Sequence, residues 1–511
     1  MSIYLIINLL LIILTLRTIS WHLQCWQIRE YRFDRLKAWL NTQDGKQFFI
    51  PWVSAGIWPR PKLSFRVLLI SVFAILLWMG ALIAVMIYPL MLAVECSIQY
   101  KMDPVGGFQF CSAQWFNKSW VETLALLFAE RLIWLFVGLS VLISNVPVRL
   151  KKLHLFYQAG KVIKNADQNI TRIGITGSYG KSSTKELLVH LLKSEFGKDA
   201  VLYNPANENT EVAIARLILS NQAFFKSSLK PKFLVIETGA YKKGEIGTVA
   251  KMIQPQYSIL TGLNQQHVEL FGSIEKTREA KFELAEGTSK TVFFNSDNAY
   301  LKAIFNDQKI TATNVPISFK AAQNLKASAH KTDFEEYGQR FTLPWPGEFF
   351  VHNTLLALEL CREIGISPAN LVLHLEHLPP LDRALSLTEK PQGYTLLRDT
   401  YSANPDGVLS AIDHLKNFPG QKIFVSIPLR ELGGHAETVH EQIFEKLAKL
   451  EVEVFWEKSD FAELGKKVLG ENFHRLDNNF ELFEAKIKSL KAGDVVLLES
   501  KLSQKVLNRF K

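Results

Sequence analysis

Hydrophobic positions follow two patterns along the chain: long runs before residue 150, and short runs alternating with amphipathic segments after it. The long runs cover residues 3–16, 67–94 and 124–146, and Glu130 and Arg131 interrupt the third. A helix needs roughly 20 mostly apolar residues to cross a bilayer, and the first run reaches that length only by including residues 17–21. The pattern predicts about three transmembrane helices within residues 1–150, with a soluble bundle of buried helices as the alternative.

Basic residues are distributed unevenly around these runs. Nine lysines and arginines lie between the first two runs, two lie between the second and third, and Arg149, Lys151 and Lys152 follow the third. Because loops rich in Lys and Arg stay in the cytoplasm, residues 17–66 and everything after residue 147 are expected on that side. Four aromatic residues interleave with the basic ones, as in a helix that lies at a membrane interface: Trp21, Trp26, Tyr31 and Trp39.

Composition narrows the class of protein further. A chain of 511 residues predicts about three domains. Much of the net charge of +10 lies in residues 17–66, which favours a membrane surface over a nucleic acid as the partner.

None of the four cysteines forms a CxxC pair, so a structural zinc site is not expected. Cys96 and Cys111 fall in the predicted outer loop, where they either form a disulfide or stay unpaired.

The strongest chemical signal is a glycine loop between a predicted strand and a predicted helix. Residues 171–176 are expected to form the strand, 177–183 (GSYGKSS) the loop, and 184–196 the helix. Converging backbone N–H groups and the helix N-terminus make such a loop a phosphate site. Lys181 is expected to contact the β and γ phosphates, and the Ser182 hydroxyl to bind Mg²⁺. Position 175 is Ile where the usual Walker motif has glycine, so the loop has the shorter GxxGKS form.

A second buried strand is predicted over residues 233–236, and it ends at Glu237. A carboxylate at the carboxyl end of a neighbouring strand is placed to bind Mg²⁺ beside a phosphate loop. Without that loop, a glutamate on the surface would be the preferred interpretation.

Six segments resemble the Mur ligases of bacterial cell-wall synthesis. They are TGSYGKSST (176–184), ETGAYKKGEI (237–246), TGLNQQHVELFGSIEKTREAKFEL (261–284), FNSDN (294–298), RDTYSANPDGVLSAI (398–412) and RELGGHAETVH (430–440). The resemblance covers about residues 155–511, and several motifs in the family's order are more specific than any one of them. Their order and spacing best match the members that add D-alanyl-D-alanine to a muramoyl tripeptide.

The resemblance implies roles for individual residues. The loop residues Gly177, Ser178, Gly180, Lys181, Ser182 and Ser183 would bind ATP. Glu237 and His267 are similar to metal ligands, and Lys281 stands where the family carries a carbamylated lysine that helps to bind a second Mg²⁺. The alternative for Lys281 is a lysine on the surface of a helix.

Further residues are implied around the nucleotide and the acceptor. Asn295 and Asn353 resemble residues beside the adenine, and Arg383 and Asp399 resemble residues that reach the nucleotide from the domain junction. Catalytic roles would fall to Lys181, His267, Lys281 and Asp399. The acceptor-binding residues would be Asn207, Asn209, Thr210 and Asn404.

The reaction implied by the resemblance is ATP-dependent formation of an amide bond through an acyl phosphate. Positioning and charge neutralisation by Mg²⁺ and basic side chains would provide most of the catalysis. The cofactors expected are ATP, about two Mg²⁺ ions and a carbamylated Lys281. The substrate is expected to be a small or lipid-linked peptide at a prokaryotic cell membrane, with the catalytic domains on the cytoplasmic side and no nucleic acid as partner.

The expected fold is α/β in three parts. Residues 1–150 would form the membrane region, 151–380 the ATP-binding central domain, and 381–511 a Rossmann-like C-terminal domain with strands over 422–427 and 494–498. Two other functions stay open: a membrane-bound ligase of the same superfamily that makes another polymer, such as poly-γ-glutamate or an alternative wall peptide, and a non-catalytic membrane scaffold.

Overall fold

The structure is a computed structural model of the 511-residue chain. It describes residues 2–40, 45, 48, 61–102, 132–206, 208–226, 230–240, 242–264, 271, 273–307, 310–345, 347–379, 385–400, 403–430 and 432–510. The chain divides into two compact units, Met1–His154 and Leu155–Lys511.

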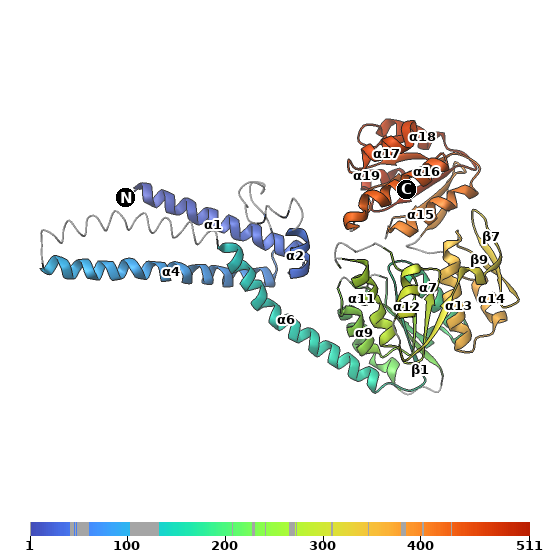
Figure 1. Ribbon diagram of the computed structural model, residues 1–511, viewed down its shortest axis with the longest axis horizontal. Helices are drawn as coiled ribbons and strands as arrows, with labels where there is room; N and C mark the ends of the chain where they lie inside the picture. The colour runs from blue at the N-terminus through green and yellow to red at the C-terminus, as the bar shows by residue number, and fades with distance from the viewer. Residues whose placement is uncertain are drawn as a thin grey trace. The chain divides into compact units, whose positions relative to one another are not determined.

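Helices make up the described part of the first unit (Figure 1). Helices α1 (Ser2–Ile28), α4 (Phe65–Met102) and the first half of α6 (Ile133–Lys164) pack through a shared apolar cluster that includes Leu23, Ile70 and Val137. The short helix α2 (Phe33–Leu40) follows a turn after α1. Both long apolar runs whose residues are described, 3–16 and 67–94, therefore lie in helices, as the sequence predicts.

Two of the aromatic residues expected at a membrane interface lie in the core of this unit. Trp26 is 1% exposed and packs edge-on against Phe33, while the Arg66 guanidinium lies 4.0 Å from the centre of the Tyr31 ring. The turn around Glu30 and Tyr31, both with positive φ, connects α1 to α2 and allows Phe33 at the start of α2 to contact Trp26.

The three transmembrane helices expected within residues 1–150 remain a prediction. Among the residues whose side chains the structure describes, one helix, Ile133–Lys164, is long and apolar enough to cross a membrane, and Phe65–Gly80 of α4 is a shorter apolar segment. A buried helix of a soluble protein can meet the same criterion, so this finding supports one span only weakly. Residues 124–131 and Cys111 lie outside the described residues, and so does any pairing of Cys96 with Cys111.

The second unit begins with a six-stranded parallel sheet in the order β2-β3-β1-β4-β5-β6. Its strands are β1 (Ile170–Thr176), β2 (Val201–Tyr203), β3 (Lys232–Glu237), β4 (Tyr257–Leu260), β5 (Thr291–Asn295) and β6 (Thr313–Ile317). The helices between and after them are α7 (Lys181–Phe196), α8 (Glu211–Ser220), α9 (Glu245–Ile253), α11 (Ile274–Glu286), α12 (Ala299–Asp307), α13 (Phe349–Glu363) and α14 (Pro368–Glu376).

Apolar residues on both faces of this sheet explain why helices cover it on two sides. Val235 of β3 belongs to the core that contains α7 and α13, whereas its neighbours Leu234 and Ile236 pack with α8, α9 and the end of α6. Side chains of a strand alternate between faces, so strands that are apolar at every position must be buried on both. A small antiparallel sheet, β7 (Gln323–Ala327), β8 (Thr332–Glu336) and β9 (Gln339–Leu343), precedes α13.

A second six-stranded sheet follows, in the order β10-β11-β15-β12-β13-β14. Strand β10 (Ser386–Glu389) is antiparallel, and β11 (Thr395–Asp399), β12 (Lys422–Ser426), β13 (Glu453–Trp456), β14 (Phe473–Arg475) and β15 (Val495–Glu499) are parallel. Its helices are α15 (Pro405–His414), α16 (Ala436–Lys449), α17 (Ala462–Leu469), α18 (Phe480–Ser489) and α19 (Gln504–Leu507). The expected α/β class with a central and a C-terminal domain is thus confirmed, and β15 reaches one residue further than predicted, to Glu499.

Candidate active site

The loop between β1 and α7 has the strand–loop–helix geometry that the sequence predicts. Helix α7 begins at Lys181, three residues earlier than expected, because Gly180 (φ 75°) ends the loop in the left-handed region. A side chain at Gly180 would start 2.5 Å from the Asn353 Oδ1, and one at Gly177 (φ 155°) would start 2.1 Å from the Thr261 Oγ1. Both glycines are therefore required by close approach of neighbouring groups.

Lys181 lies across this loop. Its Nζ donates to the carbonyls of Gly177 at 2.7 Å and Ser178 at 3.2 Å. Burial lowers the pKa of the Lys181 ammonium, and the carboxylate of Glu237 acts in the opposite direction. The loop, a helix N-terminus and a buried lysine together form a site for phosphate groups.

Two of the predicted metal ligands lie beside each other. The Ser182 Oγ donates to the Glu237 Oε1 at 3.1 Å, and Glu237 is the last residue of β3, next to β1 in the sheet. Adjacent ligands on an octahedral Mg²⁺ with bonds of 2.0–2.1 Å lie about 2.9 Å apart. The spacing of these two oxygens fits a shared Mg²⁺. Across the described ranges, no group of three His, Cys, Asp or Glu side chains could hold a metal ion.

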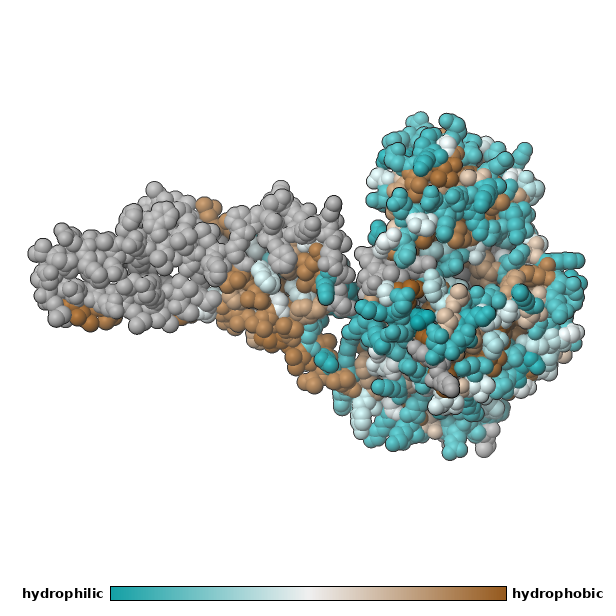
Figure 2. Space-filling view, viewed as in Figure 1, coloured by the Kyte–Doolittle hydropathy of each residue, from teal (hydrophilic) through white to brown (hydrophobic). Residues whose placement is uncertain are grey.

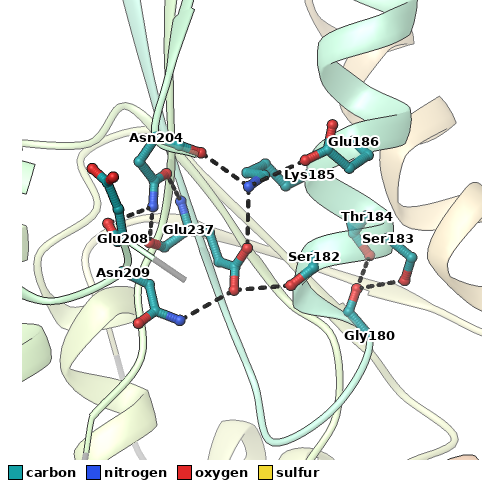
Figure 3. A network of polar contacts seen from close by, with 10 residues as sticks. All are labelled: Gly180, Ser182, Ser183, Thr184, Lys185, Glu186, Asn204, Glu208, Asn209 and Glu237. Carbon is teal, nitrogen blue, oxygen red and sulfur yellow. Dashed lines mark hydrogen bonds and ion pairs between the residues drawn. The ribbon is translucent and has the colours of Figure 1, made fainter. Parts of the chain in front are cut away.

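A buried polar network surrounds Glu237, and sequence reasoning missed most of it (Figure 3). Lys185, one turn after Ser182 on α7, is fully buried and donates to the carbonyl of Asn204 at 2.9 Å. The Asn204 amide in turn accepts from the Glu237 backbone N–H at 2.8 Å and donates to its carbonyl at 3.0 Å. Asn209, expected to bind the acceptor, donates to the Glu237 Oε1 at 3.3 Å and lines the cavity.

Lys281 is buried in α11, with 3% of its surface exposed, and is not the surface lysine of the alternative interpretation. Burial and the nearby Lys181 lower the pKa of the Lys281 amine to about 7, against the opposing effects of Glu245, Glu237 and Glu283. A lysine whose amine is largely neutral at physiological pH can act as a nucleophile.

The asparagines expected near the adenine are close to the loop. Asn353, in α13, donates to the Ser183 Oγ at 3.0 Å. Asn295, at the end of β5, donates to the carbonyl of Thr261 at 3.2 Å and accepts from the Asp297 N–H. Both amides thus fix loops around the phosphate site.

The C-terminal domain also lies beside the phosphate loop and lines the same cavity. Asn404 caps α15 by accepting from the Gly407 N–H at 3.0 Å, and the Asn264 amide donates to the Asn404 Oδ1 at 3.1 Å and to the Asp406 Oδ2 at 2.6 Å. These bonds connect the loop after β4 to the start of α15. A cavity of about 1590 Å³ is lined from both domains, including Lys181, Lys281, Asp399, Asn404 and Lys501.

Two carboxylates stand at the carboxyl ends of two adjacent strands of the second sheet. Asp399 of β11 pairs in register with Glu499 of β15. Burial raises the pKa of Asp399 to about 7, and burial together with Asp399 raises the pKa of Glu499 well above its usual value. Among the described residues, neither side-chain oxygen of the fully buried Glu499 has a hydrogen-bond partner.

The other predicted site residues are placed as follows. Thr210 caps α8 by accepting from the Ala213 N–H at 3.3 Å, and it lines the cavity together with Asn209. Asn207, His267 and Arg383 lie outside the described residues. Sequence reasoning missed Lys185, Asn204, Asn264, Asp406 and Glu499, because their roles depend on contacts between segments that lie far apart in the chain.

These features define a two-domain α/β protein with a phosphate loop on the wall of a cavity shared by both domains. Residues 175–361 match the Mur ligase middle domain, and residues 385–502 match the Mur ligase glutamate ligase domain. The chain therefore belongs to the Mur ligase family and carries its middle and C-terminal domains.

Curated relatives and solved structures agree with this assignment. The UDP-N-acetylmuramoyl-tripeptide–D-alanyl-D-alanine ligase of Haemophilus influenzae is 28% identical over 283 residues, which cover 54% of this chain and 61% of that protein. The ligase of the same name from Escherichia coli is 27% identical over 286 residues, or 53% and 61% of the two chains. The chain thus spans about three-fifths of the length of these relatives.

Two crystal structures share the fold. MurF from Acinetobacter baumannii is 20% identical with a TM-score of 0.61, and the match covers 70% of this chain and 81% of that chain. The Thermotoga maritima MurF ligase in complex with ADP is 24% identical with a TM-score of 0.59, over 70% and 82% of the two chains.

Proposed function

We propose that this protein is an ATP-dependent ligase that joins a carboxylate to an amine. The observation that carries the proposal is the Ser182–Glu237 pair beside Lys181, on the wall of the cavity that both domains line. In the proposed reaction, a carboxylate oxygen of the acceptor attacks the γ-phosphorus of ATP, and ADP leaves. The amine then attacks the acyl phosphate, an amide bond forms, and inorganic phosphate leaves with the carboxylate oxygen.

The chain's own residues would position and neutralise the reacting groups. Lys181 and the backbone N–H groups of the loop would bind the phosphates, and Ser182 and Glu237 would hold Mg²⁺. When bound, Mg²⁺ neutralises charge on the phosphates. Because the bonds from Asn264 to Asn404 and Asp406 link the domains, they would help exclude water from the acyl phosphate.

Lys281 is proposed to be carbamylated. A carbamate forms when a neutral amine attacks CO₂, and the lowered pKa of Lys281, about 7, provides that neutral amine. The product is an anion near Lys181, which would relieve the repulsion between two lysines and supply a second carboxylate-like metal ligand. His267 is proposed as a further ligand, and Asn295, Asn353, Arg383 and Asp399 as nucleotide contacts.

The substrate class is proposed from the relatives. Both relatives described above are named as ligases of D-alanyl-D-alanine and a UDP-linked muramoyl tripeptide. We infer that this chain adds D-alanyl-D-alanine, or a similar amine, to the carboxylate of a muramoyl-peptide-like acceptor, with Asn207, Asn209, Thr210 and Asn404 near the acceptor.

Membrane association is proposed for the first unit. Large apolar side chains are exposed on α4 and α6, among them Leu68, Leu76, Leu139 and Leu142, which are 42–59% exposed. Figure 2 shows brown side chains gathered over the described parts of these helices, whereas the surface of the second unit is mainly teal. Exposed apolar patches of this kind favour contact with lipid or another apolar partner. Association with a prokaryotic cell membrane, with the second unit in the cytoplasm, would bring the enzyme to a lipid-linked or soluble acceptor.

Phosphate release from ATP tests the ligase proposal. The full-length protein is given ATP and Mg²⁺, with UDP-N-acetylmuramoyl-tripeptide and D-alanyl-D-alanine added singly and together. Release that requires both substrates supports the proposed reaction. ATP binding without release under any of these conditions would contradict the substrate assignment, and absence of ATP binding would contradict the proposed function as a whole.

A further inference from the structure

Lys185 contributes a buried positive charge that the proposed reaction does not use. Its ammonium lies 3.4 Å from the Glu237 Oε2 and 3.3 Å from the Glu186 Oε1. The Lys185 side chain has none of its surface exposed, and the Glu237 side chain has only 3%. Charges in such surroundings interact strongly because little water screens them.

The two oxygens of Glu237 have different partners (Figure 3). Oε1 accepts from Ser182 and Asn209, whereas Oε2 has the Lys185 ammonium at ion-pair distance without the alignment of a hydrogen bond. Lys185 directs its hydrogen bond to the carbonyl of Asn204. It therefore acts on Glu237 mainly as a charge.

Asn204 holds the Lys185 ammonium close to Glu237. Asn204 receives the Lys185 hydrogen bond on its backbone carbonyl, and its side chain makes two hydrogen bonds to the backbone of Glu237. The Lys185 ammonium and the Glu237 backbone are thus held by the same residue.

We propose that Lys185 is a built-in counter-cation that keeps Glu237 from binding a divalent metal ion alone, so that the metal enters together with the nucleotide. The inference rests on the proposed ATP site. Lys185 lies at ion-pair distance from both Glu237 and Glu186, so the charge of the Glu237 carboxylate is already balanced when a free divalent cation approaches it. A nucleotide brings several negative charges that add to the attraction for the cation.

This arrangement would couple the binding of Mg²⁺ to the binding of the nucleotide. Ser182 and Glu237 stay at a spacing suited to Mg²⁺, yet the ion is bound strongly only when phosphates complete its coordination. The enzyme would then bind the metal–nucleotide complex in one step.

The test measures Mn²⁺ binding to the full-length protein by electron paramagnetic resonance, with and without an ATP analogue that cannot be hydrolysed. Lys185→Met removes the charge, Lys185→Gln removes it but keeps a donor for Asn204, and Lys185→Arg keeps it. The matched control, Glu186→Gln, changes the other ion-pair partner of Lys185 without removing the ammonium. Thermal unfolding curves identify which of these variants remain folded.

We expect the neutral variants to bind Mn²⁺ without nucleotide at least about tenfold more tightly than the wild type, a gain of about 1.4 kcal/mol. Lys185→Arg and Glu186→Gln should stay within roughly twofold of the wild type. Unchanged or weaker Mn²⁺ binding in a folded neutral variant would overturn the proposal, as would a tenfold gain in Glu186→Gln. Failure of the wild type to bind the ATP analogue would count separately, against the proposed function.

Discussion

The two units of the chain distribute charge and apolar surface in opposite ways. In the described part of the first unit, α4 and α6 expose large apolar side chains, and the core contains aliphatic and aromatic groups. The second unit has a mainly hydrophilic surface in Figure 2 and buries charge instead. Within the described ranges, every Lys, Asp and Glu classed as buried belongs to the second unit: Lys185, Glu237, Glu245, Lys281, Asp494 and Glu499.

With the proposed membrane association of the first unit, this difference would separate anchoring from chemistry. Burial of a charge costs stability unless partners compensate for it, so proteins retain buried charges mainly where they are used. Glu237 ends β3 and Glu499 ends β15, which is where parallel α/β sheets bind ligands. The predictions below remove these charges or the contacts around them, beginning with the largest expected effect.

Loss of Lys181 should have the largest effect. Lys181→Ala removes the cation that lies across the phosphate loop, and we expect ligase turnover to fall on the order of a thousandfold. Lys198→Ala, at an exposed position after α7, should leave turnover unchanged. Measurement of ATP-dependent phosphate release in both variants decides this. Equal turnover in Lys181→Ala and the wild type would remove the phosphate loop from the mechanism.

Lys281→Met should lower turnover on the order of a hundredfold, because it removes the amine that is proposed to become a carbamate. In the wild type, the fraction of neutral amine increases as the pH rises through about 7, so carbamate formation should increase over that range. Magnetic resonance of the protein in isotope-labelled bicarbonate would detect the carbamate. A carbamate signal that persists in Lys281→Met, or one that is absent from the wild type at pH 8, would contradict the assignment.

The contact between the two domains should have a smaller effect. Asn264→Ala removes hydrogen bonds to Asn404 and Asp406, and we expect kcat/KM to fall about tenfold, or about 1–2 kcal/mol. Asn370→Ala removes hydrogen bonds to Glu195 within the middle domain and serves as the control. Equal losses in the two variants would show that the bridging position of Asn264 has no special importance.

Loss of Glu499, the partner of Asp399, should affect stability more than turnover. The folded-state pKa values of both groups are raised, so the folded protein holds protons that the unfolded chain loses between about pH 4 and pH 7. Stability should therefore fall as the pH rises through this window. Glu499→Gln removes one charge of the pair, so we expect the free energy of unfolding at pH 8 to increase on the order of 1–3 kcal/mol.

Chemical denaturation at several pH values measures this effect. Glu463→Gln, at an exposed position, should show the pH dependence of the wild type. A Glu499→Gln variant that is less stable than the wild type at pH 8 would show that the glutamate has a stabilising partner.

The local sequence pattern was sufficient to predict the strands and the glycine loop around the phosphate site of the second unit. Strand β1, the glycine loop and Glu237 at the end of β3 follow from short-range features: apolar runs, glycines and a basic residue before a helix. Helix α7 began earlier than expected because the left-handed conformation of Gly180 ends the loop there. Strand β15 ends at Glu499, one residue later than predicted, and Glu499 is in register with Asp399.

The network around Glu237 could not be predicted in the same way. Lys185 would be interpreted from its sequence as one of several lysines on α7, and its burial depends on Asn204 after β2, 19 residues away. The resemblance implied an acceptor-binding role for Asn209, and its hydrogen bond to Glu237 was not predicted. Such contacts depend on how β1, β2 and β3 are ordered in the sheet, and neither periodicity nor motif spacing contains that order.

The most direct test of the central claim follows one oxygen atom. The acceptor carboxylate is labelled with heavy oxygen, and the inorganic phosphate released by the full-length protein with ATP, Mg²⁺ and the amine is analysed by mass spectrometry. An acyl phosphate predicts that one labelled oxygen passes from the carboxylate to the phosphate. Amide formation with unlabelled phosphate would contradict transfer of the γ-phosphate to the carboxylate, and with it the proposed mechanism of this ligase.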